Sequence, residues 1–170
     1  MRIIASSSRR AVDRLIDRGQ RTDPTIARRV ARIVAAVRRS GDPAVLRYAR
    51  RFDQLVAPAE VSRDEMQSGL SAIDPTLRTA LRTSAKHIRR IARRQVPRAW
   101  RTAVVPGVEI EQRVSPLNRV GCYVPAGRYP LPSSLLMTAI PAQVAGVTET
   151  IVMCPRPDPT VLAAAAIANV

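Results

Sequence analysis

The sequence predicts an α/β fold: an N-terminal helical segment followed by the start of a Rossmann-like parallel sheet, as an incomplete part of a larger fold. Three observations predict it. Residues 1–101 carry helix-start signals and helical periodicity, and residues 102–170 follow a strand, helix, strand order. The net charge of +15 also lies in residues 1–101, which hold 24 basic against 9 acidic residues. We therefore expect a basic helical domain, 1–101, and an incomplete Rossmann-like α/β unit, 102–170.

Helix starts are predicted from N-cap signals. An Asp-Pro pair places a side-chain acceptor before a residue whose φ is already helical. Such pairs stand at Asp23-Pro24, Asp42-Pro43 and Asp74-Pro75. Ser62 and Glu65 have the spacing of a capping box, and an earlier helix is expected over residues 8–18.

Two of these helices are predicted to be amphipathic, because apolar residues recur at the helical period. The stripe after Asp23 consists of Ile26, Val30, Ile33, Val34 and Val37, and that after Asp74 of Leu77, Leu81, Ile88 and Ile91. The second helix carries the densest positive charge of the chain.

Beyond Trp100, the pattern changes from the helical period to the two-residue alternation of apolar and polar residues that is typical of β-strands. Residues 108–114 alternate apolar and polar side chains after a turn at Gly107, which predicts a strand with one wet face. Strands over 120–124 and 150–154 flank a helix that starts at Ser133, and such a pair should be parallel. We expect Pro141 to kink or divide that helix.

A last helix is predicted over 160–169, capped by Asp158. A two-stranded parallel pair has open edges and little burial, so we expect further strands or a covering partner. We therefore expect the sequence to be part of a longer chain. No apolar stretch reaches the length of a membrane span and no signal peptide is evident, so we expect a soluble, cytoplasmic protein.

The loop 125–134 joins the end of a strand to a helix N-terminus, where anions are favoured. It contains neither GxGxxG nor a Walker motif, so it is either a ligand loop or a proline-stiffened connection. Ser133 and Ser134 could meet a cofactor phosphate or cap the helix, and we favour capping. Cys122 and Cys154 are expected to be buried free thiols, because each lies in an apolar run.

Residues 115–157, SPLNRVGCYVPAGRYPLPSSLLMTAIPAQVAGVTETIVMCPRP, closely resemble the signature region of histidinol dehydrogenases. Residues 30–55 and 73–95 resemble helical segments of the same family. The resemblance implies NAD-dependent oxidation of L-histidinol through an aldehyde to L-histidine, zinc, homodimers and Rossmann-like domains. It assigns Tyr123, in Gly121-Cys122-Tyr123-Val124-Pro125, to the family's NAD-contacting tyrosine. From the residues alone, Tyr123 would be a strand-end aromatic that fills the core.

Several features depart from the family. Ala126 replaces one glycine of a pair, and a positive φ there would be strained. Asn169 stands where the family often has glycine, but asparagine also tolerates the left-handed region. The family's zinc ligands and its Glu-His pair find no counterparts, and His87 is expected at the surface. No candidate catalytic triad and no carboxylate pair for acid/base catalysis is evident. We therefore predict no catalytic residue and no metal ligand in this sequence, and expect the isolated chain to be inactive.

Two alternatives remain. The chain could be a non-catalytic scaffold or dimerisation relative whose sheet another subunit completes. The basic helices could also bind nucleic acid in a salt-sensitive way. Nucleic acid is the least favoured partner, because the arginines are spread over many helix faces, aromatic residues are 3% of the chain and no recognition module is apparent.

Overall fold

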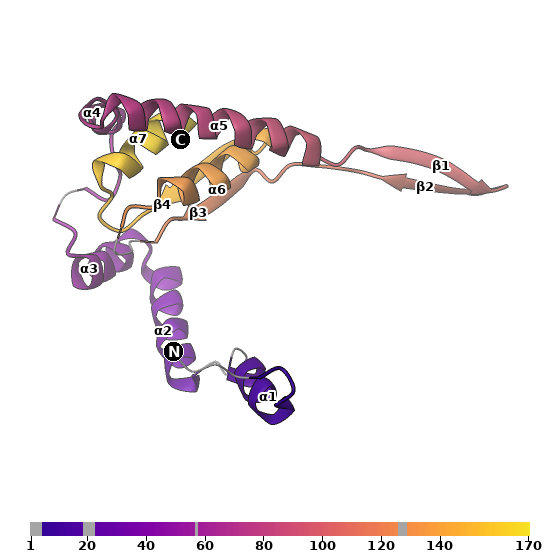
Figure 1. Ribbon diagram of the computed structural model, residues 1–170, viewed down its shortest axis with the longest axis horizontal. Coiled ribbons are helices and arrows are strands. Elements are labelled where there is room, and N and C mark those ends of the chain that lie inside the picture. The colour runs from indigo at the N-terminus through magenta and orange to yellow at the C-terminus, as the bar shows by residue number, and fades with distance from the viewer. Residues whose placement is uncertain (1–4, 19–22, 57, 126–128) are drawn as a thin grey trace. The chain divides into compact units, whose positions relative to one another are not determined.

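The computed structural model describes residues 5–18, 23–56, 58–125 and 129–170 (Figure 1). The chain divides into two compact units, one extending to Phe52 and the other running from Asp53 to Val170. No helix in the described ranges is long and apolar enough to cross a membrane.

The first unit is helical. It contains α1 (Arg9–Arg18), α2 (Pro24–Ser40) and α3 (Asp42–Asp53). Asp23 caps α2 as predicted, because its carboxylate accepts from the Thr25 N–H at 2.8 Å. The predicted cap of α3 is wrong: Asp42 is already helical, and the carbonyl of Gly41 accepts from the next turn.

Aromatic and cationic side chains join α2 to α3. The rings of Tyr48 and Phe52 stack with centroids 5.9 Å apart, and the guanidinium of Arg29 lies 5.6 Å from the Phe52 centroid. Burial is low, however, since Ala36 and Ala44 are the only buried side chains in the described part of this unit. Most of the predicted apolar stripe of α2 is exposed, with Ile26 at 60%.

The second unit holds both sheets. Its helices and strands are α4 (Arg63–Ala72), α5 (Pro75–Gln95), β1 (Trp100–Val105), β2 (Val108–Gln112), β3 (Arg119–Tyr123), α6 (Pro132–Val144), β4 (Glu149–Met153) and α7 (Pro159–Ala168). Strands β3 and β4 pair in parallel, in the register Arg119↔Glu149 to Tyr123↔Met153. This confirms the predicted strand, helix, strand unit and the α/β fold class.

Local signals set the ends of these helices. Ser62 and Glu65 form the predicted capping box, and Asp74 and Asp158 accept from first-turn N–H groups of α5 and α7. Asn169 ends α7 in the left-handed region, with φ 57° and ψ 57°. Helix α6 is not divided at Pro141, because this proline lies in the last turn and removes only one helical hydrogen bond there.

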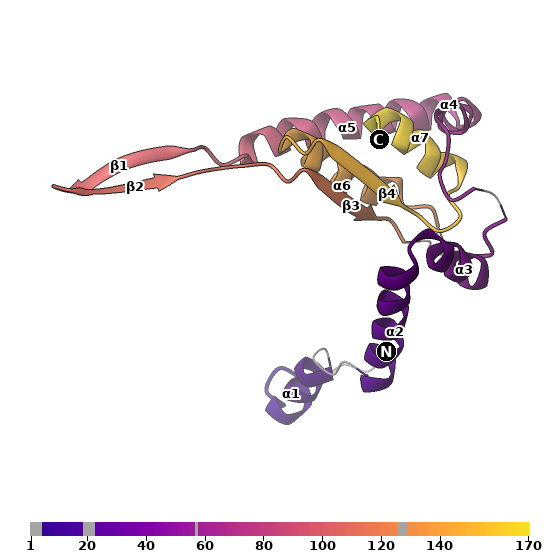
Figure 2. The same ribbon diagram turned by 180° about the vertical axis from the view of Figure 1, so that it is seen from behind.

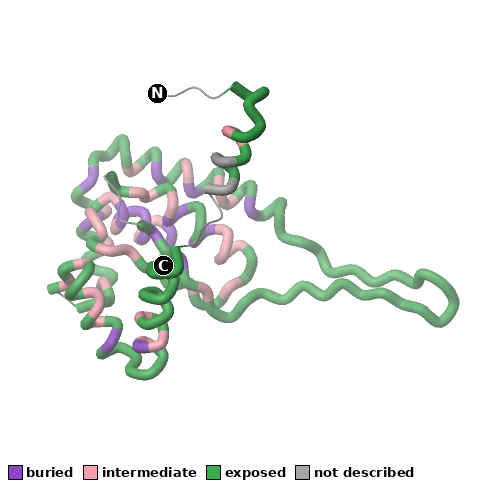
Figure 3. Tube along the Cα trace, turned by 90° about the horizontal axis from the view of Figure 1, so that it is seen from below, coloured by how far each residue is buried: buried purple, intermediate pink, exposed green. Residues whose placement is uncertain are grey.

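The core lies between the parallel strands and the helices. Val124, Leu135, Leu136 and Ile140 are its largest fully buried side chains, and buried residues gather in this unit in Figure 3. Helix α5 packs on α6 and α7, and contributes Leu81 and Ala85 to the core; Ala92 is also buried. Ile91, which the sequence places in the apolar stripe, is 60% exposed, because alanines bring the helices close on a neighbouring face.

The boundary between the units differs from the one that charge and periodicity suggest at residue 101. Helices α4 and α5 belong to the 1–101 segment by sequence, yet α4 packs against α7 and α5 against α6. The basic segment is therefore shared between the two units, whose boundary along the sequence lies between Phe52 and Asp53.

Strands β1 and β2 form an antiparallel hairpin that the sequence predicts only in part. Gly107 turns the chain with φ 82°, and Trp100 pairs with Gln112. Every hairpin residue is exposed (Figure 3). The expectation that one face of the strand is buried is therefore wrong for the described chain, where no other element packs on Val108 or Ile110.

Candidate functional site

Tyr123 is the last residue of β3, at the carboxyl end of the parallel pair. Its side chain is 62% exposed, which is inconsistent with the alternative of a core-filling aromatic. Met153 is its register partner on β4 and is 46% exposed. Ligands of open α/β sheets bind at the carboxyl ends of the strands, and both side chains lie at that end.

Within the described part of residues 53–170, no helix covers the face of the β3–β4 sheet that carries Tyr123 (Figure 2). Cys122 and Val124 point to the helix-covered side, where both are buried, whereas Tyr123, Ile151 and Met153 are exposed. No helix lies in front of the two strands in Figure 2. Gly121 lies close to the Met153 side chain, because a Cβ built on Gly121 would come within 2.7 Å of the Met153 Cε. Met153 therefore lies across the glycine, beside Tyr123.

The loop after β3 leads to an uncapped helix. Helix α6 begins at Pro132 with Leu131 at its N-cap, and no side-chain oxygen accepts from its first N–H groups. The prediction that Ser133 or Ser134 caps this helix is wrong, because Pro132 occupies the first helical position and both serines lie inside the first turn. The question of strain at Ala126 lies outside the described residues.

Both cysteines are free, as predicted. Cys122 is buried and Cys154 half-buried. Burial, and secondly the negative charge of Asp158, raises the pKa of the Cys154 thiol. Its Sγ donates to the carbonyl oxygen of Pro155 at 3.7 Å. A protonated thiol is a poor nucleophile and metal ligand, so neither role is indicated for Cys154.

Zinc donors do not come together in the described residues. No group of three or more histidine, cysteine, aspartate or glutamate side chains is placed to hold a metal there. His87 is exposed on α5, which confirms its expected surface position. The residues present do not fit a zinc site, since zinc requires three or four nitrogen, oxygen or sulfur ligands.

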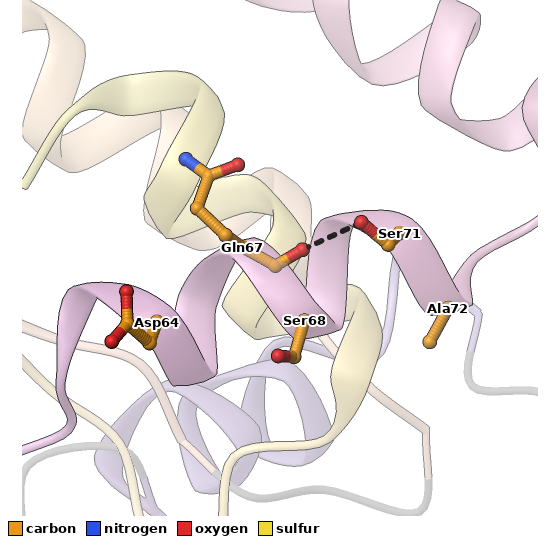
Figure 4. Close-up of a pocket in the computed structure, with 5 residues that line it drawn as sticks. All are labelled: Asp64, Gln67, Ser68, Ser71 and Ala72. Carbon is orange, nitrogen blue, oxygen red and sulfur yellow. Dashed lines mark hydrogen bonds between the residues drawn. The ribbon is translucent and has the colours of Figure 1, made fainter.

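A shallow hollow along α4 is another candidate site in the described chain. Its lining residues are Asp64, Gln67, Ser68, Ser71 and Ala72 (Figure 4). All five are exposed residues of one helix, and the Ser71 hydroxyl donates to the Gln67 carbonyl. The hollow has one carboxylate and no base beside a hydroxyl, so it offers no pair for nucleophilic or acid/base catalysis.

Comparison with known proteins identifies the family. The model of the family described as histidinol dehydrogenase matches residues 16–170. This chain belongs to the histidinol dehydrogenase family. A histidinol dehydrogenase of Aromatoleum aromaticum is 45% identical over 156 residues, which cover 87% of this chain and 36% of that protein. A histidinol dehydrogenase of Pseudomonas aeruginosa is 39% identical over 169 residues, which cover 95% of this chain and 38% of that protein.

The fold agrees with a solved histidinol dehydrogenase. The crystal structure of the enzyme from Elizabethkingia anophelis superposes with a TM-score of 0.76 and 24% identity, covering 88% of this chain and 35% of that one. The chain thus spans a little over a third of the length of the histidinol dehydrogenases that it matches. The resemblance inferred from residues 115–157 is confirmed at the level of the family.

Proposed function

We propose that this chain forms part of an NAD-dependent oxidoreductase that oxidises L-histidinol to L-histidine through the aldehyde. Family membership supports the reaction class. The observation that carries the proposal is the position of Tyr123, exposed at the carboxyl end of a parallel strand pair. Ligands of open α/β sheets occupy this end.

NAD fits the features around Tyr123. The phenol ring can pack against or hydrogen-bond to the dinucleotide, and Met153 adds a polarizable surface beside it. Helix α6 has no side-chain cap at Leu131, and its dipole favours an anion such as a phosphate at this end, although Pro132 has no N–H and the Ser134 N–H already donates to the Leu131 carbonyl. When bound, NAD accepts the hydride. The role assigned to this chain is to bind and orient the cofactor.

The described residues supply binding groups but no catalytic set. They hold no zinc donor set, and the lone histidine is far along the sequence from Tyr123. We therefore derive no step through zinc and propose that the 170-residue chain does not turn over L-histidinol alone. By the family resemblance, we further propose that the longer enzyme is a cytoplasmic homodimer.

A second candidate function is a non-catalytic scaffold. The fully exposed β1–β2 hairpin favours it, because Val105, Val108 and Ile110 form an apolar surface that nothing in the described chain covers. Two-stranded hairpins are at best marginally stable in water, so a covering surface is expected. A scaffold would need no affinity for NAD, which separates the two candidates.

Titration with NAD tests the proposed cofactor role. The measurement is the heat or fluorescence change of the 170-residue chain, of Tyr123→Ala and of Tyr129→Ala. Tyr129 is the matched control, because it is 77% exposed in the loop that follows β3. We expect NAD binding that weakens several-fold or more in Tyr123→Ala only. Equal binding by all three proteins would contradict the assignment of Tyr123.

A further inference from the structure

Helix α5 carries five cationic side chains along one side. They are Arg82, Lys86, Arg89, Arg90 and Arg93; except for the adjacent Arg89 and Arg90, successive members are three or four residues apart, as on one side of a helix. From the first to the last, the series spans about 16 Å at the rise of an α-helix. The sequence suggests arginines scattered over many faces, whereas the structure gathers four arginines and Lys86 around one groove that Ile167 of α7 also lines.

This series of cations, the α5 cationic stripe, has no counter-charge in the described chain. The α5 sequence contains no acidic residue, and α7 contains no charged one. The ion pairs of the described residues lie elsewhere, at Arg101–Glu109, Arg113–Glu111 and Arg119–Glu149. Like charges three and four residues apart destabilise a helix, so an anionic ligand that lies along the stripe would relieve repulsion within α5.

The stripe borders a groove rather than a flat surface. Ala85 and Ile167 complete its lining, and its volume is 420 Å³. No acidic side chain lines it. Four of the five cations are exposed and Arg89 is half-buried, so their charged groups remain accessible to a ligand.

The chemistry of the groove favours phosphates over an acidic protein. Arginine presents a planar fork of donors that matches phosphate oxygens in a bidentate way. Protein interfaces instead have an apolar, well-packed centre. Here the apolar lining is one alanine and one isoleucine. A row of cations without ion-pair partners is complementary in charge to a ligand that carries a row of phosphates.

We propose that the α5 cationic stripe binds the phosphate backbone of single-stranded nucleic acid, without reading its bases. The stripe contains no aromatic residue for base stacking, so the contacts are to phosphates alone. Binding of this kind is sequence-independent and weakens steeply as salt rises. This binding site is separate from the residues assigned to NAD.

Fluorescence anisotropy with a labelled oligothymidine of about 20 nucleotides tests the proposal. The stripe variant is Arg82→Gln/Lys86→Gln/Arg90→Gln. The matched control is Arg63→Gln/Arg94→Gln/Arg98→Gln, which removes the same charge from exposed positions that do not line the groove. Circular dichroism checks that both variants fold.

For the 170-residue chain, contacts to five phosphates predict a slope of log affinity against log salt of about −3.5, since each phosphate on a single strand contributes about −0.7. Loss of three contacts in the stripe variant should reduce the slope to about −1.4 and weaken binding about tenfold or more near 0.1 M salt. The control variant should retain a steeper slope than the stripe variant and a higher affinity.

Three results would overturn the proposal. Equal losses in the stripe and control variants would show a diffuse effect of net charge. Poly-L-glutamate of similar length that binds as tightly as the oligonucleotide would show that any polyanion, including an acidic protein, is accepted. A lack of measurable oligonucleotide binding by the unmodified chain at low salt would exclude the site directly, whatever the variants do.

Discussion

Gly69 of α4 lies directly against Leu162 of α7. A Cβ built on Gly69 would come within 2.6 Å of the Leu162 Cβ and 3.1 Å of the Pro159 carbonyl oxygen. Because the nearest atom is a Cβ fixed to the backbone, it cannot move aside without moving α7. This crossing joins a helix of the basic segment to the last helix of the α/β unit.

We therefore expect Gly69→Ala to lower the free energy of unfolding by about 1–2 kcal/mol, because so close a contact puts the cost of overpacking in the upper part of its range, about 2–3 kcal/mol, and alanine's helix propensity offsets about 1. Urea denaturation measures the change. Ser68→Ala, at an exposed position on the same helix, should stay within about 0.5 kcal/mol of the unmodified chain. A Gly69→Ala chain that is as stable as the control would show that the crossing is not tight.

Leu136 and Met137 test the position of the core. Leu136 is fully buried and Met137 is 64% exposed on the same helix, α6. Leu136→Ala should cost about 2–5 kcal/mol of unfolding free energy, because it removes buried methyl groups and leaves a cavity. Met137→Ala should cost much less in the same urea experiment, and similar costs for both would mean that α6 is rotated relative to the core.

Acid should weaken the N-cap of α5. Hydrogen bonds from the backbone of Thr76, and then of Leu77, lower the pKa of Asp74 below its ordinary 3.8. A carboxyl group with a lowered folded pKa adds stability above its unfolded pKa, and this contribution is lost as pH falls through the folded pKa.

Asp74→Asn keeps an acceptor at the cap but removes the titration. Its stability should therefore fall less than that of the unmodified chain between about pH 5 and about pH 2, as measured by thermal unfolding. Glu65 is present in both proteins, so its contribution to the pH dependence of stability cancels when the two are compared. Identical pH profiles would be evidence against a charged cap at Asp74.

The β1–β2 hairpin should exchange its amide hydrogens quickly. All its residues are exposed, and its pairing is not supported by packing within the described chain. In hydrogen–deuterium exchange of the 170-residue chain, we expect residues 100–112 to exchange orders of magnitude faster than residues 135–140 of α6. Strong protection of the hairpin would reveal a partner, such as a second copy of the chain.

Local signals in the sequence predicted local structure well. The capping residues Asp23, Ser62, Asp74 and Asp158 act on neighbours two or three positions away, so short patterns suffice to find them. The parallel pairing of β3 and β4 followed from the crossover between them. Strand β1 was missed because residues 100–105 do not alternate: Arg101 and Thr102 are both polar, and three apolar residues follow them.

Features that depend on distant partners were not predictable in the same way. Ile91 belongs to the predicted apolar stripe of α5 but is 60% exposed, whereas the adjacent Ala92 is buried, and the helical period alone could not decide between them. The exposure of Tyr123 likewise depends on the absence of a covering element over β3 in the described chain, and its proposed role came from family resemblance rather than from spacing.

We propose that this chain supplies cofactor-binding residues of a histidinol dehydrogenase, and its described residues hold no group placed to bind zinc. The most direct test is the rate of NADH formation by the purified 170-residue chain with L-histidinol, NAD and zinc. We predict no NADH above the rate without protein. Zinc-dependent NADH formation that requires L-histidinol would contradict this account.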